Sequence, residues 1–295
     1  MAKSFRYKPV DHWFKGNTHV HSTVSDGALD FAQLSALYAG AGYDFLVRAD
    51  HWKPSDARSD PAAYPLLWLD GMELDGRDEH NALFHIVCLG TFTGIDRTRQ
   101  SVIEATEAAR AQGGIIILAH PHWCANTFED TRRFPFDGVE VYNNVCQWGT
   151  GKGDGSVYWS AMLAHNPNAL AFASDDTHLT AKDPGWNGGW IMVNAAERTP
   201  EALLEAIRTG QFYATTGPEF YTIERNGGSV HVRTSPVKFI WLVGPGSKAL
   251  KFIAQDGDLL TEAEFTLPEW DTMYLKLEDA NRRNAWSNPL FCVES

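Results

Sequence analysis

The feature that most constrains the fold is an alternation of short apolar runs with helix-like segments between about residues 14 and 215. Such alternation is typical of repeated βα units, and a continuous apolar run such as "GIIILA" (114–119) suits a parallel strand buried on both faces. The helix-like segments include "ALDFAQLSALYAGAG", "QSVIEATEAARAQGG" and "TPEALLEAIRTGQ". We therefore expect an α/β fold whose strands close, or nearly close, into a βα barrel.

The character of the sequence changes after "ATTGPEF" (214–220). The runs "SVHVRTSP", "VKFIWLVGPG", "ALKFIAQDG" and "TMYLKLED" are β-like and are separated by Gly, Pro and Asp turns, with no helix-like segment between them. This pattern predicts a barrel domain at 1–218 and a small antiparallel, β-sandwich-like appendage at 219–295. The appendage could cap the barrel, shape a pocket or mediate self-association, so the oligomeric state stays open.

Several classes of protein are disfavoured by composition. No run of about 18 apolar residues exists and the first residues lack the apolar core of a secretory signal, so we expect a cytoplasmic protein without a membrane partner. A net charge of −12 disfavours binding to extended nucleic acid. The four cysteines lack CxxC spacing, which predicts buried or idle thiols instead of a disulfide framework or zinc ribbon.

Histidine and acidic residues recur at the carboxyl ends of the predicted strands, where barrel enzymes assemble their sites. They are His19, His21, Asp50, His51, Glu73, His120, Asp176 and His178. A single HxH pair is about as often accidental as functional, but recurrence at five strand ends is hard to attribute to chance. Imidazole and carboxylate are ligands of Zn, Mn and Fe, and their number exceeds the four of one tetrahedral ion. More than one metal ion is therefore indicated.

These motifs, in their order and spacing, resemble the polymerase and histidinol phosphatase (PHP) family of metal-dependent phosphoesterases. "HVHSTVSDG" is similar to the family's HxH…SDG opening, "RADH" to its TDH motif, "GMEL" to its GxE and "SDDTH" to its final SDxH. "HIVCLG", "LAHP" and "DGVEVYN" fall between them in the family's order. The resemblance spans residues 17 to about 218 and implies a distorted (βα)7 TIM-like barrel.

The resemblance also implies the ligands of two or three divalent ions, Mn, Fe or Zn. The first ion would be held by His19, His21, Glu73 and Asp176, the second by Asp26, His51 and His178, and the third by Glu73, His85 and His120. Many family members have a histidine where this chain has Asp26. A harder carboxylate ligand there favours Mn or Fe over Zn.

Two further residues are candidates for catalysis. Arg48 could clamp a substrate oxyanion or pair with Asp50, and we favour the pairing; Asp50 itself is expected to orient a ligating imidazole. His122, in "HPHW", could protonate the leaving group, although a loop histidine at such a place is about as often merely solvated.

Candidates for substrate binding are Trp123, Asn143 and Lys152. Trp123 lies in a loop near the expected site and could stack on a flat group. Asn143 and Glu140, in "VEVYNN", are expected to face the same end of the barrel, and for both we favour hydrogen bonding to neighbouring ligands over metal contact. Lys152 belongs to the glycine-rich "GTGKGDGS", which lacks the GK[ST] ending of a P-loop and is expected to be a mobile loop, conceivably a lid.

The resemblance implies hydrolysis of a small phosphorylated molecule by a metal-bridging hydroxide, with no serine or cysteine nucleophile. One alternative is a PHP-like metallohydrolase of a carboxylic or carbamic ester, because "ALLEAIRTGQFYATTGPEF" and "NRRNAWSNPLF" also resemble hydrolases with a β-sandwich tail. A second alternative, of another class, is a non-catalytic metal-binding module.

Overall fold

The computed structural model describes residues 3–56, 63–255 and 257–293. The helices are α1 (Phe31–Gly40), α2 (Val102–Ala111), α3 (Asp130–Arg133), α4 (Asn144–Thr150), α5 (Ser156–Leu163) and α6 (Pro200–Arg208). The strands of the first part are β1 (Lys3–Phe5), β2 (Trp13–Val20), β3 (Phe45–Arg48), β4 (Leu67–Leu69), β5 (Gly71–Arg77), β6 (Leu83–Leu89), β7 (Ile115–Leu118), β8 (Gly138–Asn143), β9 (Leu170–Ser174), β10 (Trp190–Asn194) and β11 (Phe212–Thr215). The later strands are β12 (Phe220–Asn226), β13 (Ser229–Val237), β14 (Phe239–Val243), β15 (Ala249–Ile253), β16 (Leu260–Thr266), β17 (Tyr274–Glu278), β18 (Asn284–Ser287) and β19 (Phe291–Val293).

Each of the three predicted helices begins after a residue whose side chain caps its first turn. Asp30 before α1 and Ser101 before α2 each accept a hydrogen bond from a backbone N–H of the first turn in a capping box. Thr199 caps α6 ahead of Pro200, a residue favoured in a first turn. The apolar run at 115–118 forms β7, all of whose residues are buried.

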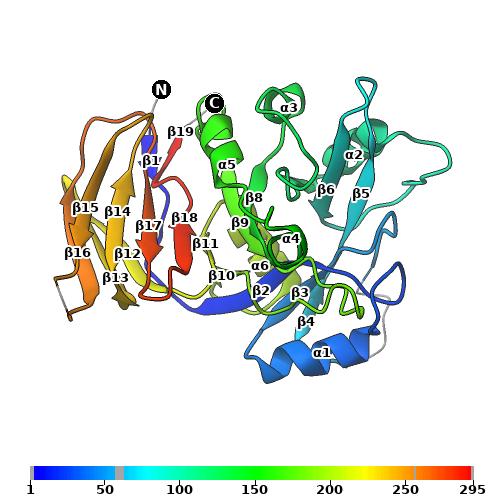
Figure 1. Cartoon of the computed structure of the whole chain (residues 1–295), viewed down its shortest axis with the longest axis horizontal. Coiled ribbons are helices and arrows are strands. Elements are labelled where there is room, and N and C mark those ends of the chain that lie inside the picture. Colours follow the sequence, from blue (N-terminus) through cyan, green and yellow to red (C-terminus); the bar gives the residue numbers. More distant parts are fainter. Residues whose placement is uncertain (1–2, 57–62, 256, 294–295) are drawn as a thin grey trace.

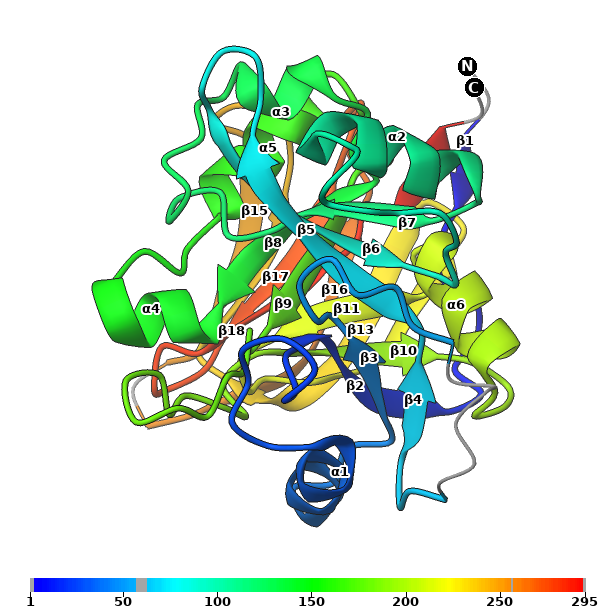
Figure 2. The ribbon, with the colours of Figure 1, turned by 90° about the vertical axis from the view of Figure 1, so that its right-hand side faces the viewer.

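Two large sheets carry most of the strands. One has the order β5-β6-β7-β8-β9, and the other has the order β15-β14-β17-β18-β11-β10-β2-β3-β4. Helices α1, α2 and α6 lie outside the strands of the first part, as Figure 2 shows. This arrangement is a mixed α/β fold.

The expected closed barrel is wrong for the described residues, because no continuous ladder joins the two sheets. Isolated bridges link the two sheets, from Val20 at the end of β2 to Thr177 after β9, and from His51 after β3 to Glu73 on β5. The ladder is interrupted at these two junctions, whereas β5, β6 and β7 pair antiparallel within a continuous sheet. Antiparallel neighbours need no crossover helix, and none lies in the described residues between β5 and β6, so the βα alternation is interrupted there.

The strands after residue 219 pair antiparallel, as predicted. Strands β12, β13 and β16 form a sheet of their own, whereas β14, β15, β17 and β18 extend the nine-stranded sheet through the pairing of β18 with β11. Figure 1 shows these strands gathered at one end of the molecule. A sheet thus crosses the predicted boundary at 218/219, and the boundary itself stays a prediction.

Candidate metal centre

The nine residues predicted to bind metal come together in one cluster. They are His19, His21, Asp26, His51, Glu73, His85, His120, Asp176 and His178. They project from β2, β5 and β6 or from the segments that follow β2, β3, β7 and β9. The bridges that link the two sheets, Val20 to Thr177 and His51 to Glu73, lie within this region. The cluster therefore forms where the ends of β2 and β3 meet the two edges of the five-stranded sheet.

The first group has the dimensions of a tetrahedral metal site. The Nε2 atom of His19 lies 3.1 Å from His21 Nε2, 3.3 Å from Glu73 Oε2 and 3.2 Å from Asp176 Oδ1. His21 Nε2 lies 3.3 Å and 3.2 Å from the same two carboxylate oxygens. Nitrogen and oxygen donors about 2.0–2.1 Å from a tetrahedral ion would be about 3.3–3.4 Å apart. Four buried donors at this spacing fit one divalent ion.

The second group surrounds Asp26, whose side chain is half exposed. The Asp26 Oδ2 atom lies 3.3 Å from His178 Nε2 and 3.7 Å from His51 Nε2. The Asp26 Oδ1 atom lies 3.5 Å from His21 Nδ1, a buried atom without a hydrogen-bond partner among the described residues. This group is the solvent-facing end of the cluster.

The third group lies around the other oxygen of Glu73. Glu73 Oε1 is 2.8 Å from His85 Nδ1 and 3.4 Å from His120 Nε2. His120 Nε2 is also 3.6 Å from Asp176 Oδ2. Glu73 and Asp176 thus each offer one oxygen to the first group and the other toward His120, so the buried clusters are consistent with a multinuclear metal site.

Backbone strain marks this cluster. His120 has φ 24° and Asp176 has φ 57°, in the left-handed region that residues with a side chain rarely occupy. Such conformations cost free energy and persist where the surrounding structure holds them, most often at functional sites.

The charges of the first group favour a bound cation. Burial alone lowers the pKa of both His19 and His21, but Asp176 and Glu73 outweigh it, raising the pKa of His19 well above its ordinary value and that of His21 to about 9. Burial alone would raise the pKa of Glu73, yet His19 and His85 hold it well below its ordinary value. In the absence of metal, protons on the imidazoles compensate the buried carboxylates. A divalent ion can take their place.

Glu140 and Asn143, on β8, form hydrogen bonds with the predicted metal ligands. Glu140 Oε1 lies 2.8 Å from His19 Nδ1, and its Oε2 accepts a hydrogen bond from the backbone N–H of His120 at 2.9 Å. The fully buried Asn143 amide donates to Glu140 at 2.8 Å and to Asp176 at 3.3 Å. These contacts agree with the hydrogen-bonding role considered for both, and they favour that role over substrate contact for Asn143.

Asp75, which the sequence reasoning missed, supports His51. Its Oδ1 atom lies 3.0 Å from His51 Nδ1, and its Oδ2 atom is 2.7 Å from the Arg97 guanidinium. Alternation along β5 places Asp75 on the same face as Glu73, two residues before it. The alternation could have indicated Asp75 from the sequence. It does not show that His51 is the ligand that Asp75 contacts.

Arg48 and Asp50 are placed differently from the expectation. Asp50 accepts hydrogen bonds from Ser22 and Ser25, through both their backbone N–H groups and their hydroxyls, at 2.8–3.1 Å. It therefore shapes the loop that carries Asp26 instead of orienting a ligating imidazole. The buried Arg48 guanidinium packs 4.3 Å from the centre of the Phe31 ring.

A cavity of about 290 Å³ adjoins the metal ligands. Besides those ligands it is lined by Trp123, Val145, Cys146, Gly149, Thr150 and Asp183. Trp123 lines this cavity, whereas the exposed His122 and Lys152 do not, and substrate contact by Trp123 stays a prediction. The segment expected to be a mobile loop is the end of α4 followed by a left-handed turn at Gly151.

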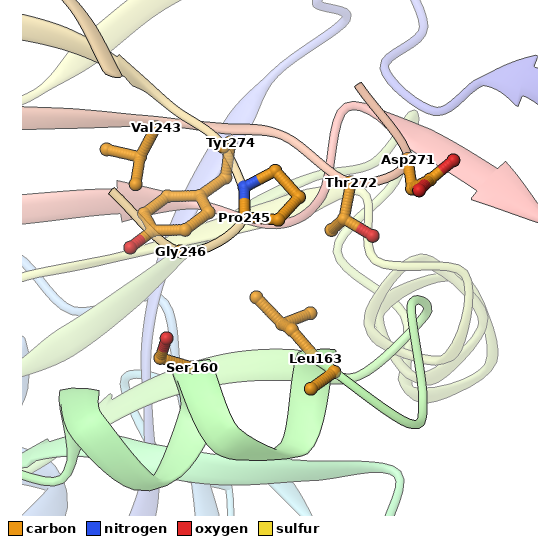
Figure 3. A pocket seen from close by; sticks show the side chains of 10 residues that line it. Ser160, Leu163, Val243, Pro245, Gly246, Asp271, Thr272 and Tyr274 are labelled. Carbon is orange, nitrogen blue, oxygen red and sulfur yellow. The ribbon is translucent and has the colours of Figure 1, made fainter. Parts of the chain in front are cut away.

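A second cavity, of about 330 Å³, lies away from the metal ligands. Figure 3 shows Ser160 and Leu163, on α5, facing Val243, Pro245 and Tyr274 of the later strands. It separates α5 from the β14–β15 turn and the start of β17. Because it contains no histidine and one carboxylate, it does not resemble a second metal centre.

Comparison with known proteins agrees with this architecture. No family model and no curated protein matches the chain. Among solved structures it is similar to a two-domain protein from Bacteroides vulgatus ATCC 8482 that contains a predicted PHP-like metal-dependent phosphoesterase, with 13% identity, a TM-score of 0.50 and coverage of 97% of this chain and 98% of that one. The PHP resemblance is thus confirmed at the level of the fold along nearly the whole chain.

Two other solved structures are similar over a smaller part of the chain. A candidate metal-dependent phosphoesterase from Bifidobacterium adolescentis ATCC 15703 has 12% identity and a TM-score of 0.44. An amidohydrolase from Chromobacterium violaceum, solved with sulfate and no metal, has 16% identity and a TM-score of 0.41. Each match covers 58% of this chain and 90% of the other. In the part of the chain that the structure describes, no helix is long and apolar enough to cross a membrane.

Proposed function

We propose that the protein is a metal-dependent hydrolase that cleaves a small phosphorylated molecule. The observation that carries this proposal is the first group of four buried donors, His19, His21, Glu73 and Asp176, at tetrahedral spacing beside an open cavity. When bound, divalent ions supply Lewis-acid chemistry: they lower the pKa of water toward neutrality and neutralise charge that develops on phosphoryl oxygens. The groups around Asp26 and His120 would hold the second and third ions.

The residues of this chain would hold and orient the reactants. Glu73 and Asp176 each face two donor groups, so they fix the spacing between neighbouring ion sites. Glu140 keeps His19 Nδ1 occupied, which directs His19 Nε2 toward the metal. Trp123 and Val145 line the cavity and would exclude water from one side of the substrate. The general acid predicted for the leaving group, His122, stays a prediction.

Hydrolysis of a carboxylic or carbamic ester is a second candidate, favoured by the charges in the cavity. Neither lysine nor arginine is among the described residues that line it. A phosphate would therefore depend on the metal ions alone for compensation of its charge, whereas a neutral ester would need no such compensation.

An assay panel separates these activities. Purified protein loaded with Mn, Fe or Zn would be tested on p-nitrophenyl phosphate, its diester and carboxylate esters, and we expect metal-dependent phosphate release. Turnover of carboxylate esters with no phosphate release would refute the phosphoesterase proposal. Protein that binds no transition metal and stays inactive after reconstitution would instead support a non-catalytic module.

Variants test the site itself. His51→Ala and Asp176→Ala should abolish hydrolysis while thermal unfolding stays cooperative, because each removes a predicted metal ligand. His231→Ala is the matched control, since His231 lies on β13 and pairs with Glu262, away from the cluster. Undiminished turnover in both ligand variants would refute the proposed site.

A further inference from the structure

Cys146 places a thiol beside the innermost end of the metal cluster. Its side chain is buried, lines the cavity, and its Sγ atom lies 4.0 Å from Asp176 Oδ2. Donor atoms of Cys146, Asp176 and His120 all lie within 4.8 Å of one another. The sequence suggested only a buried or idle thiol.

One side chain fixes the position of this thiol relative to the cluster. Asn143 Oδ1 accepts the backbone N–H of Cys146 at 3.0 Å, while Asn143 Nδ2 donates to Asp176 Oδ2 at 3.3 Å and to Glu140 at 2.8 Å. The same asparagine therefore holds the first turn of α4 and two carboxylates of the site. Cys146 cannot move far from Asp176 without breaking these bonds.

We propose that Cys146 is a thiolate ligand of the ion bound by His120. This inference rests on the proposed metal centre. The group of Glu73, His85 and His120 supplies three donors, fewer than the four of a closed tetrahedral site, and His120 belongs to both that group and the group with Cys146 and Asp176. Metal–sulfur and metal–oxygen bonds of about 2.3 Å and 2.0–2.2 Å place two donors of a tetrahedral ion about 3.5–3.7 Å apart. The observed 4.0 Å between Cys146 Sγ and Asp176 Oδ2 is within about 0.5 Å of this spacing, a difference that a small side-chain rotation removes.

A thiolate would make the two ends of the cluster chemically different. Soft sulfur donors select Zn, Fe or Co over Mn and Mg, whereas the carboxylate of Asp26 is a hard ligand at the solvent-facing end. The ion at His120 would therefore prefer a softer metal than the ion at Asp26. On binding, the thiol proton passes to solvent and the sulfur lone pair occupies the coordination position.

Cobalt substitution tests this ligand directly, because a thiolate bound to Co²⁺ gives a near-ultraviolet charge-transfer band that oxygen and nitrogen ligands do not. We expect the band in Co²⁺-loaded wild-type protein and its loss in Cys146→Ser. Cys124→Ser is the matched control, since Cys124 Sγ lies 3.5 Å from the opposite nitrogen of His120, Nδ1. This control should keep the band. Zn²⁺ affinity at one site should fall by roughly tenfold or more in Cys146→Ser, at least the loss seen when an outer partner is removed.

The outcomes separate this inference from the proposed metal centre. Cobalt bound by wild-type protein without the band, or a band that survives in Cys146→Ser and disappears in Cys124→Ser, would overturn the role of Cys146 and leave the metal centre standing. A wild-type protein that binds no cobalt would overturn both. Far-ultraviolet circular dichroism checks folding, and Cys146→Ala, which also removes the thiol but adds no hydroxyl, should reproduce the loss of the band.

Discussion

Glu140 contacts His19 and can set the tautomer in which His19 binds metal, without binding the metal itself. It is buried, and its two oxygens are occupied by His19, by Ser174 and Asn143, and by the backbone of His120. Glu140→Gln keeps the size of the side chain but removes the charge that holds His19 in the correct tautomer. We expect metal affinity to fall by about 10–100-fold, as is typical for such partners.

A competition titration with a chromophoric chelator would measure this change. Glu205→Gln, at an exposed position of α6, should leave metal affinity unaltered. Equal affinities for wild-type protein and Glu140→Gln would show that the contact with His19 does not matter for binding.

The protonation of His21 predicts how the stability of the metal-free protein depends on pH. In the metal-free chain burial lowers its pKa, but hydrogen bonds with Asp176 and Glu73 raise it from 6.5 to about 9. Because the folded-state pKa exceeds the unfolded value, the proton's contribution to stability is fully present below about 6.5 and is lost as pH rises through about 9. Metal competes with this proton, so metal affinity should rise over the same interval.

Urea unfolding of chelator-treated protein across that interval would measure the effect. The free energy of unfolding should fall with rising pH without metal, and the fall should shrink when metal is restored. A metal-free protein that grows more stable from neutral to alkaline pH would contradict the assignment.

At the scale of elements, the loop after β2 depends on a close approach at Gly27. A Cβ there would lie 2.3 Å from the carbonyl oxygen of His21 and 2.9 Å from the nitrogen of Ser22, both backbone atoms. Gly27→Ala must therefore displace the loop that carries Asp26. We expect a loss of about 1–3 kcal/mol in the free energy of unfolding, as for other overpacked sites, with weaker binding of the second ion.

Gly40→Ala is the control for this substitution. Gly40 ends α1 and a Cβ there meets nothing within 4 Å. Alanine in a helix is more favourable than glycine by about 0.5–1 kcal/mol, so this variant should be as stable as wild type or more so. Denaturant titrations compare the two variants. A Gly27→Ala protein as stable as Gly40→Ala would contradict the claim that the loop after β2 needs glycine at position 27.

The elements also show what could be predicted and what could not. The helix-like segments between apolar runs located α1, α2 and α6, and an ordered set of motifs located the nine clustered residues. The antiparallel pairing of β5, β6 and β7 escaped prediction because an apolar run is buried equally well in either direction. Asp75 and Cys146 were missed because their roles arise from neighbours distant in the sequence, His51 and Asp176.

At the scale of the whole molecule, the strands after residue 219 are joined to the first part by more than a linker. Asn288 is fully buried; its Oδ1 accepts the backbone N–H of Ala171 on β9 at 2.8 Å, and its Nδ2 donates to the carbonyl of Phe212 on β11 at 2.9 Å. Its own backbone N–H donates to the hydroxyl of Tyr7 at 2.7 Å. One side chain therefore connects both large sheets to the segment before β19.

These contacts predict that the chain unfolds as one unit. Asn288→Ala leaves the N–H of Ala171 and the carbonyl of Phe212 buried without their partner, which costs about 1–3 kcal/mol for each such group. In differential scanning calorimetry we expect a single transition at a lower temperature, and Asn281→Ala, at an exposed turn, should leave that temperature unchanged. Two separate transitions, with only one of them shifted by Asn288→Ala, would instead show that residues 1–218 and 219–295 fold independently. Since β11 pairs with both β10 and β18 in one sheet, we expect the protein comprising only residues 1–218 to expose an unpaired edge and to aggregate.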